Sequence, residues 1–480
     1  MYPGQTPREW RKQLYSDLAH GMKMIDIWPL ADILDNGPGG CYLDPVPAHV
    51  STIAPDSEFN GYAGMFKSVR RGFHELGRFD DIIRFSHPAT RAKTAIMFSE
   101  TTDIWLPAGV QIAYNHSGGG TTYSEVAPTP NRYGTWGEAK HTLFLALLHT
   151  QISLDAIIEE DAAAGHLGQY DVVYVAETHI TAAATAGLAK WVAAGGTLFA
   201  TAGAGVYDEH NRTNHAFAEL TGATSTGLYT GTRGLNGTLD FVKQEYEDDF
   251  SVKTFSFALT NCALACSLPW AEQLDTVTLD STLLEAAAEP LGVFGQKHLF
   301  TQAPGKSAEV LGKFSDGSPA VLRVSHGKGK VVFAAFHPGL AYFHPALPRR
   351  PVDRATTDES YNHFVPTAFA TAARDALLVG TTGADKIADG QPATASEQLV
   401  DLTVLVSDHK QPAVKGTVIA LVNWSDKYPV KDLVVTLNCD VPAWTKAEMA
   451  SGNTVTSAKA GSTVKFTVAA LEDADAIILR

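Results

Sequence analysis

The chain has 480 residues, of which 45% are hydrophobic and 19% charged, and its formal net charge is −15. This composition is that of a soluble globular protein, and the length exceeds one ordinary core, so we expect roughly two or three domains. The negative charge would repel a phosphate backbone, which argues against nucleic acid as a partner.

The first 90 residues alternate helix and strand. Helical spacing of apolar side chains is found over residues 7–23 and 61–76, a short apolar strand is predicted at Met24–Leu30, and a loop rich in Gly and Pro follows it. These elements make one and a half βα units. Such a segment cannot close a barrel by itself.

The N-terminus carries a helix start and no leader. Thr6 is a suitable N-cap and Pro7 a suitable first helical residue, and no basic-then-apolar signal sequence precedes them. No apolar run approaches the roughly 20 residues of a membrane span. We therefore expect a cytoplasmic protein without membrane contact, and we expect the natural protein to extend upstream of Met1, where a missing segment could change that location.

Residues 91–380 predict an open α/β domain. The unit Leu167–Asp208 contains a strand, a helix ended by Gly195-Gly196, and a second strand, which is the pattern of a parallel sheet covered by helices. Apolar strands are predicted at Lys93–Ser99, Ser153–Ile158, Asp171–Ala176 and Thr197–Thr201, and helices at Glu138–His149 and Ala183–Ala194.

The second strand of that unit runs into Gly203-Ala204-Gly205. Hydrolases and amidotransferases with open α/β folds carry a Ser or Cys nucleophile on a sharp turn at this place. No side chain of this turn can attack a substrate. The sequence therefore predicts an open α/β fold typical of enzymes, without a nucleophilic side chain at the turn where such enzymes carry one.

The rest of the chain predicts a hairpin, a helix and a small β domain. Residues 326–329, His-Gly-Lys-Gly, lack the spacing and the following helix of a phosphate loop and are interpreted as a hairpin turn. A helix is predicted near Tyr361–Leu378, and residues 381–398 have linker composition. Short strands separated by polar turns over residues 399–480 predict a β-sandwich.

The four cysteines are too few and too scattered for a disulfide framework. Cys262 and Cys266 have the spacing of one pair of metal ligands, but no second Cys or His pair accompanies them. We interpret them as buried or idle thiols, and we expect no metal and no cofactor.

Three stretches carry a resemblance to a known family. They are residues 18–23 (Leu-Ala-His-Gly-Met-Lys) with Ile27-Trp28, residues 93–98 (Lys-Thr-Ala-Ile-Met-Phe) with Trp105, and residues 191–198 (Trp-Val-Ala-Ala-Gly-Gly-Thr-Leu) with residues 205–209. In this order they resemble the rear portion of glycoside hydrolase family 42 β-galactosidases. The third stretch, with its Gly-Gly turn and its Asp-Glu end, is the most similar.

The resemblance implies a fold for each part of the chain. Residues 1–90 correspond to the remnant of a (β/α)8 barrel, residues 91–380 to a flavodoxin-like or class I amidotransferase-like trimerisation domain, residues 381–398 to a linker, and residues 399–480 to a small β-sandwich. It also implies a homotrimer with carbohydrate as its partner. The family's acid/base and nucleophile glutamates would lie before Met1, so no catalytic residue is assigned to this chain.

Three residues are candidates for contact with a sugar. Trp28 lies at the mouth end of the presumed last barrel strand, where a sugar ring can stack on its face, although a core position is an equal alternative. Asp32 follows the same strand and could bind substrate or be solvated in a loop. Trp105 could serve a trimer contact or the mouth of a neighbour's site.

A possible second site follows strands of the α/β domain. Asp208 and Glu209 come after a strand end, where open α/β sheets bind ligands, but an interface or turn role is favoured for them because no nucleophile accompanies them. The loop after residue 336 contributes His337, His344 and Arg349, which could bind an anionic sugar or form an ion-paired surface between domains or subunits.

The sequence thus predicts the non-catalytic rear part of a glycoside-hydrolase-like protein, which supports oligomer assembly and part of the sugar site. The alternative is a stand-alone oligomerising or carbohydrate-binding protein without hydrolase activity. An amidotransferase or Cys hydrolase is disfavoured, because no cysteine lies at positions 203–205.

Overall fold

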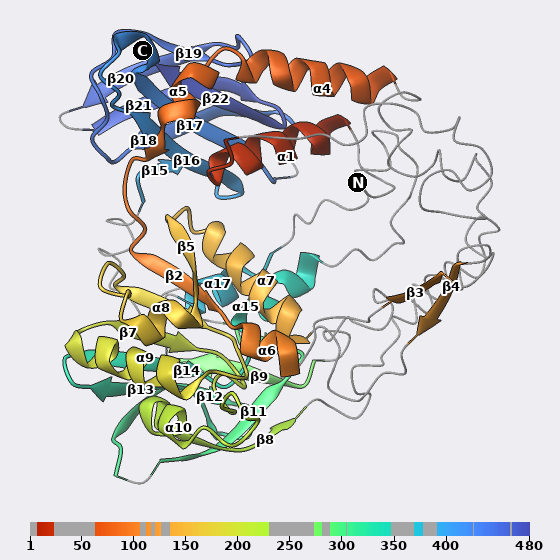
Figure 1. Cartoon of the computed structure of the whole chain (residues 1–480), viewed down its shortest axis with the longest axis vertical. Helices are drawn as coiled ribbons and strands as arrows, with labels where there is room; N and C mark the ends of the chain where they lie inside the picture. The colour runs from red at the N-terminus through yellow and green to blue at the C-terminus, as the bar shows by residue number, and fades with distance from the viewer. Residues whose placement is uncertain are drawn as a thin grey trace.

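The computed structural model describes residues 7–23, 63–105, 112–116, 121–125, 135–229, 273–280, 289–303, 305–346, 369–377, 391–425, 427–460 and 463–480. Most of their strands form a nine-stranded sheet from the middle of the chain and two antiparallel sheets from its C-terminal part (Figure 1). Two small hairpin-like sheets complete the set, β3 (Ile112–His116) with β4 (Thr121–Glu125) and β8 (Ala223–Tyr229) with β11 (Lys297–Gln302).

The nine-stranded sheet is half parallel and half antiparallel. Its parallel strands, in spatial order, are β14 (Gly329–Ala334), β7 (Thr197–Ala200), β6 (Val172–Val175), β2 (Thr94–Phe98) and β5 (Leu154–Ile158). Its antiparallel strands are β13 (Pro319–His326), β12 (Ala308–Phe314), β9 (Asp275–Leu279) and β10 (Leu291–Val293). The predicted parallel arrangement is confirmed for all four strands expected between residues 93 and 201.

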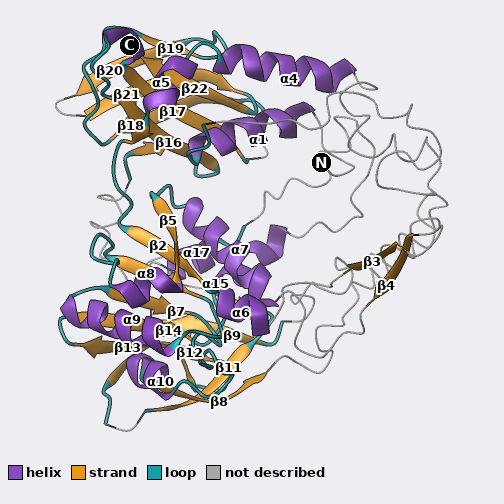
Figure 2. Ribbon diagram, in the orientation of Figure 1, coloured by secondary structure: helices purple, strands orange, loops and turns teal. Residues whose placement is uncertain are grey.

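Two groups of helices pack against this sheet (Figure 2). One group contains α7 (Thr135–Leu148), α15 (Pro338–Phe343) and α17 (Thr371–Ala376), and the other contains α8 (Glu159–Ala164), α9 (Ala182–Ala194) and α10 (His215–Thr221). A short helix, α6 (Glu100–Trp105), follows β2 directly. The α9 helix begins at the N-cap Thr181 and ends at Gly195, as its sequence pattern predicts.

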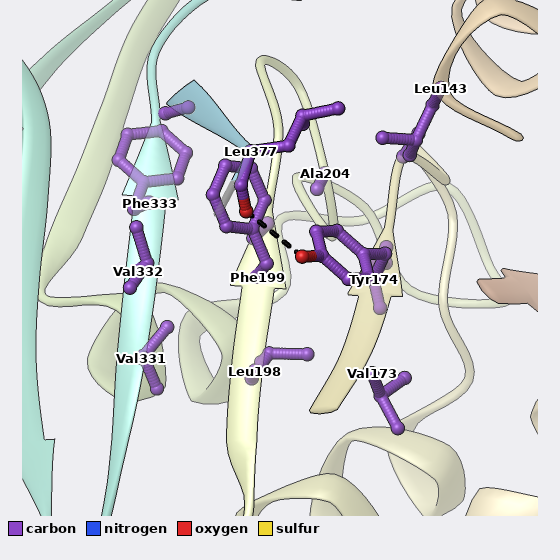
Figure 3. Packing of buried hydrophobic residues seen from close by; sticks show 14 of the residues in the cluster. Leu143, Val173, Tyr174, Leu198, Phe199, Ala204, Val331, Val332, Phe333 and Leu377 are labelled. Carbon is purple, nitrogen blue, oxygen red and sulfur yellow. Dashed lines mark hydrogen bonds between the residues drawn. The ribbon is translucent and has the colours of Figure 1, made fainter. Parts of the chain in front are cut away.

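Continuous apolar strands form the core of this region. Residues 172–175 and 197–200 are buried at every position, which a strand covered on both faces requires. Figure 3 shows their side chains beside those of β14. The hydroxyl of Tyr174 donates to the carbonyl of Leu377 at 2.9 Å, so a buried polar group next to α17 is satisfied.

The C-terminal part contains two antiparallel sheets that share one hydrophobic cluster. The five-stranded sheet has the order β1 (His87–Pro88), β16 (Val400–Ser407), β17 (Gly416–Asn423), β22 (Ala474–Leu479) and β19 (Ala447–Met449). The four-stranded sheet has the order β15 (Ala393–Ala395), β18 (Val430–Leu437), β21 (Thr463–Leu471) and β20 (Val455–Ala460). Side chains from both sheets, including Ile419 and Phe466, fill the space between them.

The first helices of the chain lie against the last sheet (Figure 1). The helices α1 (Pro7–Ala19), α4 (Ala63–Leu76) and α5 (Asp80–Phe85) cover the other face of the five-stranded sheet. A buried ion pair joins α1 to α4, with Arg11 Nη2 2.8 Å from Glu75 Oε2. The described residues of segment 1–90 thus complete the C-terminal unit, and the strand expected at 24–30 lies outside the described residues.

Three local predictions, a hairpin turn, a linker and a helix, can be compared with the structure. Residues 326–329 form the turn between β13 and β14, which confirms the hairpin interpretation. Part of the predicted linker forms a strand. This strand, β15, pairs with β18, and its buried Ala393 belongs to the cluster between the sheets. Of the helix expected at 361–378, the described residues contain α17 alone.

Candidate functional site

Polar side chains gather where the parallel strands end. Ser99 follows β2, Glu159 follows β5 and Glu177 follows β6 closely, and all three are buried. The carboxyl ends of parallel strands form the edge at which open α/β sheets bind ligands. This edge is therefore a candidate ligand-binding edge of the sheet.

Glu177 is a fully buried carboxylate with one cation beside it. Its side chain has 0% exposure, and Lys140 Nζ of α7 lies 3.0 Å from Oε1. The backbone N–H of Ser99 donates to the same oxygen at 3.1 Å, whereas Oε2 has no hydrogen-bond partner among the described residues. Burial raises the pKa of Glu177 to about 7, and Lys140 opposes that shift.

Glu159 organises the neighbouring backbone. Its carboxylate accepts hydrogen bonds from Ser99 Oγ at 3.1 Å, from the Thr101 hydroxyl, and from the backbone N–H of Thr181 at 2.9 Å. Thr181 is the N-cap of α9, so a negative charge lies at the start of that helix, where it is stabilising. The arrangement of Glu159 is that of a structural carboxylate.

Trp105 and Glu209 are brought together at this edge. The indole Nε1 of Trp105 donates to the carbonyl of Glu209 at 3.1 Å, and the indole ring stacks on His179 with 6.0 Å between ring centroids. The Glu209 carboxylate accepts from the backbone N–H of Ala182 at 2.8 Å. Trp105 remains 41% exposed, so one face of this edge presents an aromatic surface to solvent.

Asp208 stabilises a turn. It accepts hydrogen bonds from the backbone N–H groups of His210 and Arg212, each at 2.9 Å, and its carboxylate pairs with the Arg212 guanidinium at 3.0 Å. These donors lower the pKa of Asp208 against the opposing effect of desolvation. The contacts are all local, as a turn role requires.

The turn Gly203-Ala204-Gly205 is packed shut. Gly205 has φ +59°, and a Cβ there would lie 2.3 Å from the ring of Phe217. Ala204 is 4% exposed, and the backbone N–H of Gly203 donates to Nδ1 of the buried His298 at 2.9 Å. The space beside this turn is thus filled by neighbouring side chains.

His337 and His344 lie at the two ends of α15. His337 precedes the helix at its N-cap, is 1% exposed, and has its pKa lowered to about 3 by burial, with a smaller effect from His298. His344 stacks on Phe294, with 3.8 Å between ring centroids. Their contacts lie with His298 and Phe294, away from the local turn of Asp208.

The remaining predicted site residues, Trp28, Asp32 and Arg349, lie outside the described residues, as do Cys262 and Cys266. Within the described ranges no group of three His, Cys, Asp or Glu side chains is arranged to hold a metal ion. None of the helices in those ranges has the length and apolar character that crossing a bilayer requires.

Sequence analysis missed Glu177, Lys140 and His179. Glu177 could have been found, because it comes directly after the predicted strand Asp171–Ala176 and at the ligand-binding edge of the sheet. Lys140 carries no such signal. Its partner is determined by how α7 packs against the sheet, which helical periodicity alone does not give.

Comparison with known proteins gives structural neighbours and no sequence match. No family model and no curated protein sequence matches this chain. A catalytic mutant of Gan42B, a GH42 β-galactosidase from G. stearothermophilus, has a TM-score of 0.55 at 13% identity over 99% of this chain and 51% of that chain. A β-galactosidase from Bacillus circulans sp. alkalophilus has a TM-score of 0.50 at 13% identity over 88% and 46% of the two chains.

The fold is similar to about half of a family 42 β-galactosidase. The expected resemblance is therefore confirmed at the level of the fold, and the chain spans about half the length of these structural neighbours.

Proposed function

We propose that this chain is the non-catalytic rear part of a glycoside-hydrolase-like protein, with an amidotransferase-like domain that assembles the oligomer and with a C-terminal β-sandwich. The proposal takes residues 91–380 as the assembly domain and residues 399–480 as the sandwich. A carbohydrate is its partner, and the reactive carboxylates belong to a segment upstream of this chain.

The single observation that carries the proposal is the closed turn at 203–205. In a parallel sheet of this kind the nucleophile would stand at Ala204, but that residue is 4% exposed and a Cβ on Gly205 would lie 2.3 Å from the Phe217 ring. A fold retained with its reactive turn packed shut supports a role in assembly. The alignment of 99% of this chain with half of a longer glycosidase supports the same interpretation.

An exposed apolar surface at the sheet edge supports oligomer assembly. Ile104 is 70% exposed and Trp105 41% exposed on α6, and Ile158 is 53% exposed at the end of β5, which pairs with β2. A patch of exposed large apolar side chains marks a protein interaction site. We assign this α6 surface, Ile104 with Trp105 and Ile158, to the contact between subunits.

Light scattering on the purified chain tests the assembly. The expected mass is three times the chain mass of 51.3 kDa. Ile104→Glu places a charge in the contact and should give monomers, whereas the matched substitution Val310→Glu, at a residue 37% exposed on β12, should leave the trimer intact. A wild-type monomer at micromolar concentration, or a trimer that survives Ile104→Glu, would contradict the assignment.

A panel of aryl glycosides tests the absence of reactive carboxylates. The chain alone should give no turnover. Covalent labelling of this chain by a mechanism-based glycosidase inactivator would overturn the proposal. If the chain forms trimers and binds sugar but the natural protein has no upstream barrel segment, the alternative of a stand-alone carbohydrate-binding protein is the correct one.

A further inference from the structure

A cavity lies between the α/β region and the C-terminal sheets. Its volume is about 540 Å³, within the range of roughly 300–1,000 Å³ found for small-molecule pockets. Gln151 fixes the junction beside it, because its Nε2 donates to the carbonyls of Glu397 and Val400, each at 3.1 Å, and its Oε1 accepts from the N–H of Ala395 at 3.0 Å. The cavity is therefore bounded by two units that are hydrogen-bonded to each other.

The cavity wall combines apolar side chains with polar and charged ones, among them Arg91. Phe144 and Leu148 of α7 contribute from one side and Leu405 of β16 from the other, with Pro88 and Ala92 of the connecting segment between them. Walls of this kind take the hydrocarbon body of a ligand and leave its orientation to a few polar groups.

The polar group of special interest is Asp401 on β16. Its side chain is 3% exposed, and its Oδ2 has no hydrogen-bond partner among the described residues. The closest basic group is Nε2 of His20, at 3.8 Å, which is beyond hydrogen-bond distance. A buried carboxylate oxygen without a donor is costly, and a ligand that supplies a donor to that oxygen recovers the cost.

The hydrogen bond of His20 is directed away from Asp401. Nδ1 of His20 lies 2.7 Å from the carbonyl oxygen of Ser16, and because a carbonyl oxygen only accepts, Nδ1 must carry the proton. Nε2 of His20 and Oδ2 of Asp401 are 3.8 Å apart and make no hydrogen bond to each other. An N–H donor that reaches Oδ2 from the cavity would therefore supply a hydrogen bond that this oxygen lacks among the described residues.

His20 also covers the carboxylate. Its side chain is 38% exposed and lines the cavity, while Asp401 Oδ2 is shielded from solvent. Among the described residues, the His20 imidazole is hydrogen-bonded only to Ser16, which lies in the same helix. Turning this ring outward opens a path from the cavity to Asp401.

We propose that this cavity binds a small organic amine, whose ammonium group displaces the His20 ring and pairs with Asp401 while its ring or chain packs on Phe144, Leu148 and Leu405. The net charge of −15 favours a cationic ligand over an anionic one. Amino sugars and lipophilic ring amines share this chemistry. The inference does not depend on the glycosidase-like function, since neither the α6 surface nor the turn at 203–205 takes part in it.

Calorimetric titration of the full chain at pH 7.5 tests the proposal with two matched pairs of probes. Glucosamine is compared with glucose, and cyclohexylamine with cyclohexanol. We expect an amine to bind at least about tenfold more tightly than its neutral partner, because a charged hydrogen bond to the carboxylate is lost in the latter. Tighter binding of glucosamine identifies an amino sugar as the source, and tighter binding of cyclohexylamine identifies a lipophilic amine.

Three variants test the roles of the residues. Asp401→Asn should weaken amine binding by at least about tenfold, and His20→Ala, which removes the cover, should strengthen it by about threefold or more. The control is Asp155→Asn, because Asp155 lines the same cavity but already accepts a hydrogen bond from the Tyr170 hydroxyl at 2.9 Å. Its amine affinity should stay within about twofold of the wild type.

The proposal is overturned if no amine binds at millimolar concentration, or if the neutral rings bind as tightly as the amines. It is equally overturned if folded Asp401→Asn, verified by circular dichroism, binds amines as the wild type does. The wild-type comparison of amine with neutral partner decides the matter if that variant does not fold.

Discussion

Two buried carboxylates occupy different parts of the molecule and have opposite surroundings. Glu177, at the edge of the parallel sheet, has Lys140 at 3.0 Å and the N–H of Ser99 at 3.1 Å. Asp401, on the five-stranded sheet, accepts from the backbone N–H of Leu402, and its basic neighbour His20 is 3.8 Å away, beyond hydrogen-bond distance. Burial raises the pKa of both groups, but a cation opposes the shift at contact distance for Glu177 alone.

The difference separates a structural charge from one suited to a ligand. Glu177 is enclosed by its own fold, since its backbone carbonyl also accepts from the N–H of Gly205 at 2.7 Å. Asp401 lies at the wall of a cavity, where a further molecule can supply what the chain does not. A buried carboxylate is therefore a candidate binding group when no cation lies at contact distance and a cavity lies beside it.

The largest expected effect comes from removing the cation of the compensated pair. Lys140→Met leaves the buried Glu177 without its cation, and should lower the free energy of unfolding at pH 8 by about 4 kcal/mol, as measured by urea denaturation. The loss should be smaller at pH 5, where Glu177 is protonated. As a control, Lys190→Met on the exposed face of α9 should change stability by no more than about 0.5 kcal/mol.

A double-mutant cycle sharpens this result. If Lys140 acts through Glu177, the variant with both Lys140→Met and Glu177→Gln should be less destabilised than the sum of the single variants. Additive losses would show that Lys140 contributes through packing or through Asp103, 3.2 Å from its Nζ, and would weaken the comparison drawn above.

The pH dependence of Glu177→Gln has the next largest effect. The folded-state pKa of about 7 exceeds the ordinary value of 4.5, so folding favours the protonated form. The stability contributed by protonated Glu177 is fully present below pH 4.5 and is lost as the pH rises through 7. Relative to the wild type, Glu177→Gln should therefore gain up to about 3 kcal/mol between pH 4.5 and pH 8.

Denaturation curves of the two proteins at several pH values provide the measurement. The buried histidines His149, His298 and His337, whose pKa values burial lowers, titrate in both proteins and cancel in the difference. A difference that does not change across this pH range would show that Glu177 stays ionised throughout.

The tight packing of the turn at residues 203–205, beside Glu177, predicts a smaller loss of stability. Gly205→Ala introduces a methyl group 2.3 Å from the Phe217 ring at φ +59°, whereas Gly165→Ala, at φ +79°, meets nothing within 4 Å. Both substitutions strain the backbone, so the loss of unfolding free energy for Gly205→Ala should exceed that for Gly165→Ala by about 2 kcal/mol. Equal losses in thermal or urea unfolding would mean that the turn has room for a side chain.

The smallest expected effect has the opposite sign. Asp401→Asn removes a buried charge whose Oδ2 has no hydrogen-bond partner among the described residues, so the ligand-free protein should gain about 1 kcal/mol at pH 8. Asp408→Asn, with a side chain 80% exposed, should leave stability unchanged. Destabilisation by Asp401→Asn would indicate that the carboxylate has a structural partner and would remove the contrast with Glu177.

The sequence predicted most of the helices and strands around Glu177 and Asp401, but few of the contacts that these two side chains make. The apolar runs that became β2, β6 and β7 are long enough to predict strands, and the bare turn at 203–205 is visible in the sequence itself. Asp208 and Glu209 were expected after a strand end and Trp105 in a loop; Trp105 instead ends helix α6, and the structure brings it to Glu209. Lys140 and Asp401 gave no signal, because their significance depends on partners 37 and 381 positions away.

Periodicity and turn chemistry alone determined that this chain has an α/β region followed by a strand-rich region, since both signals are local in the chain. Only the tertiary structure decided that the first helices cover the last sheet, that Glu177 is compensated by a lysine from another element, and that Asp401 is not. Burial and pairing of a charge depend on which distant segments pack around it, and that packing is a property of the folded chain as a whole.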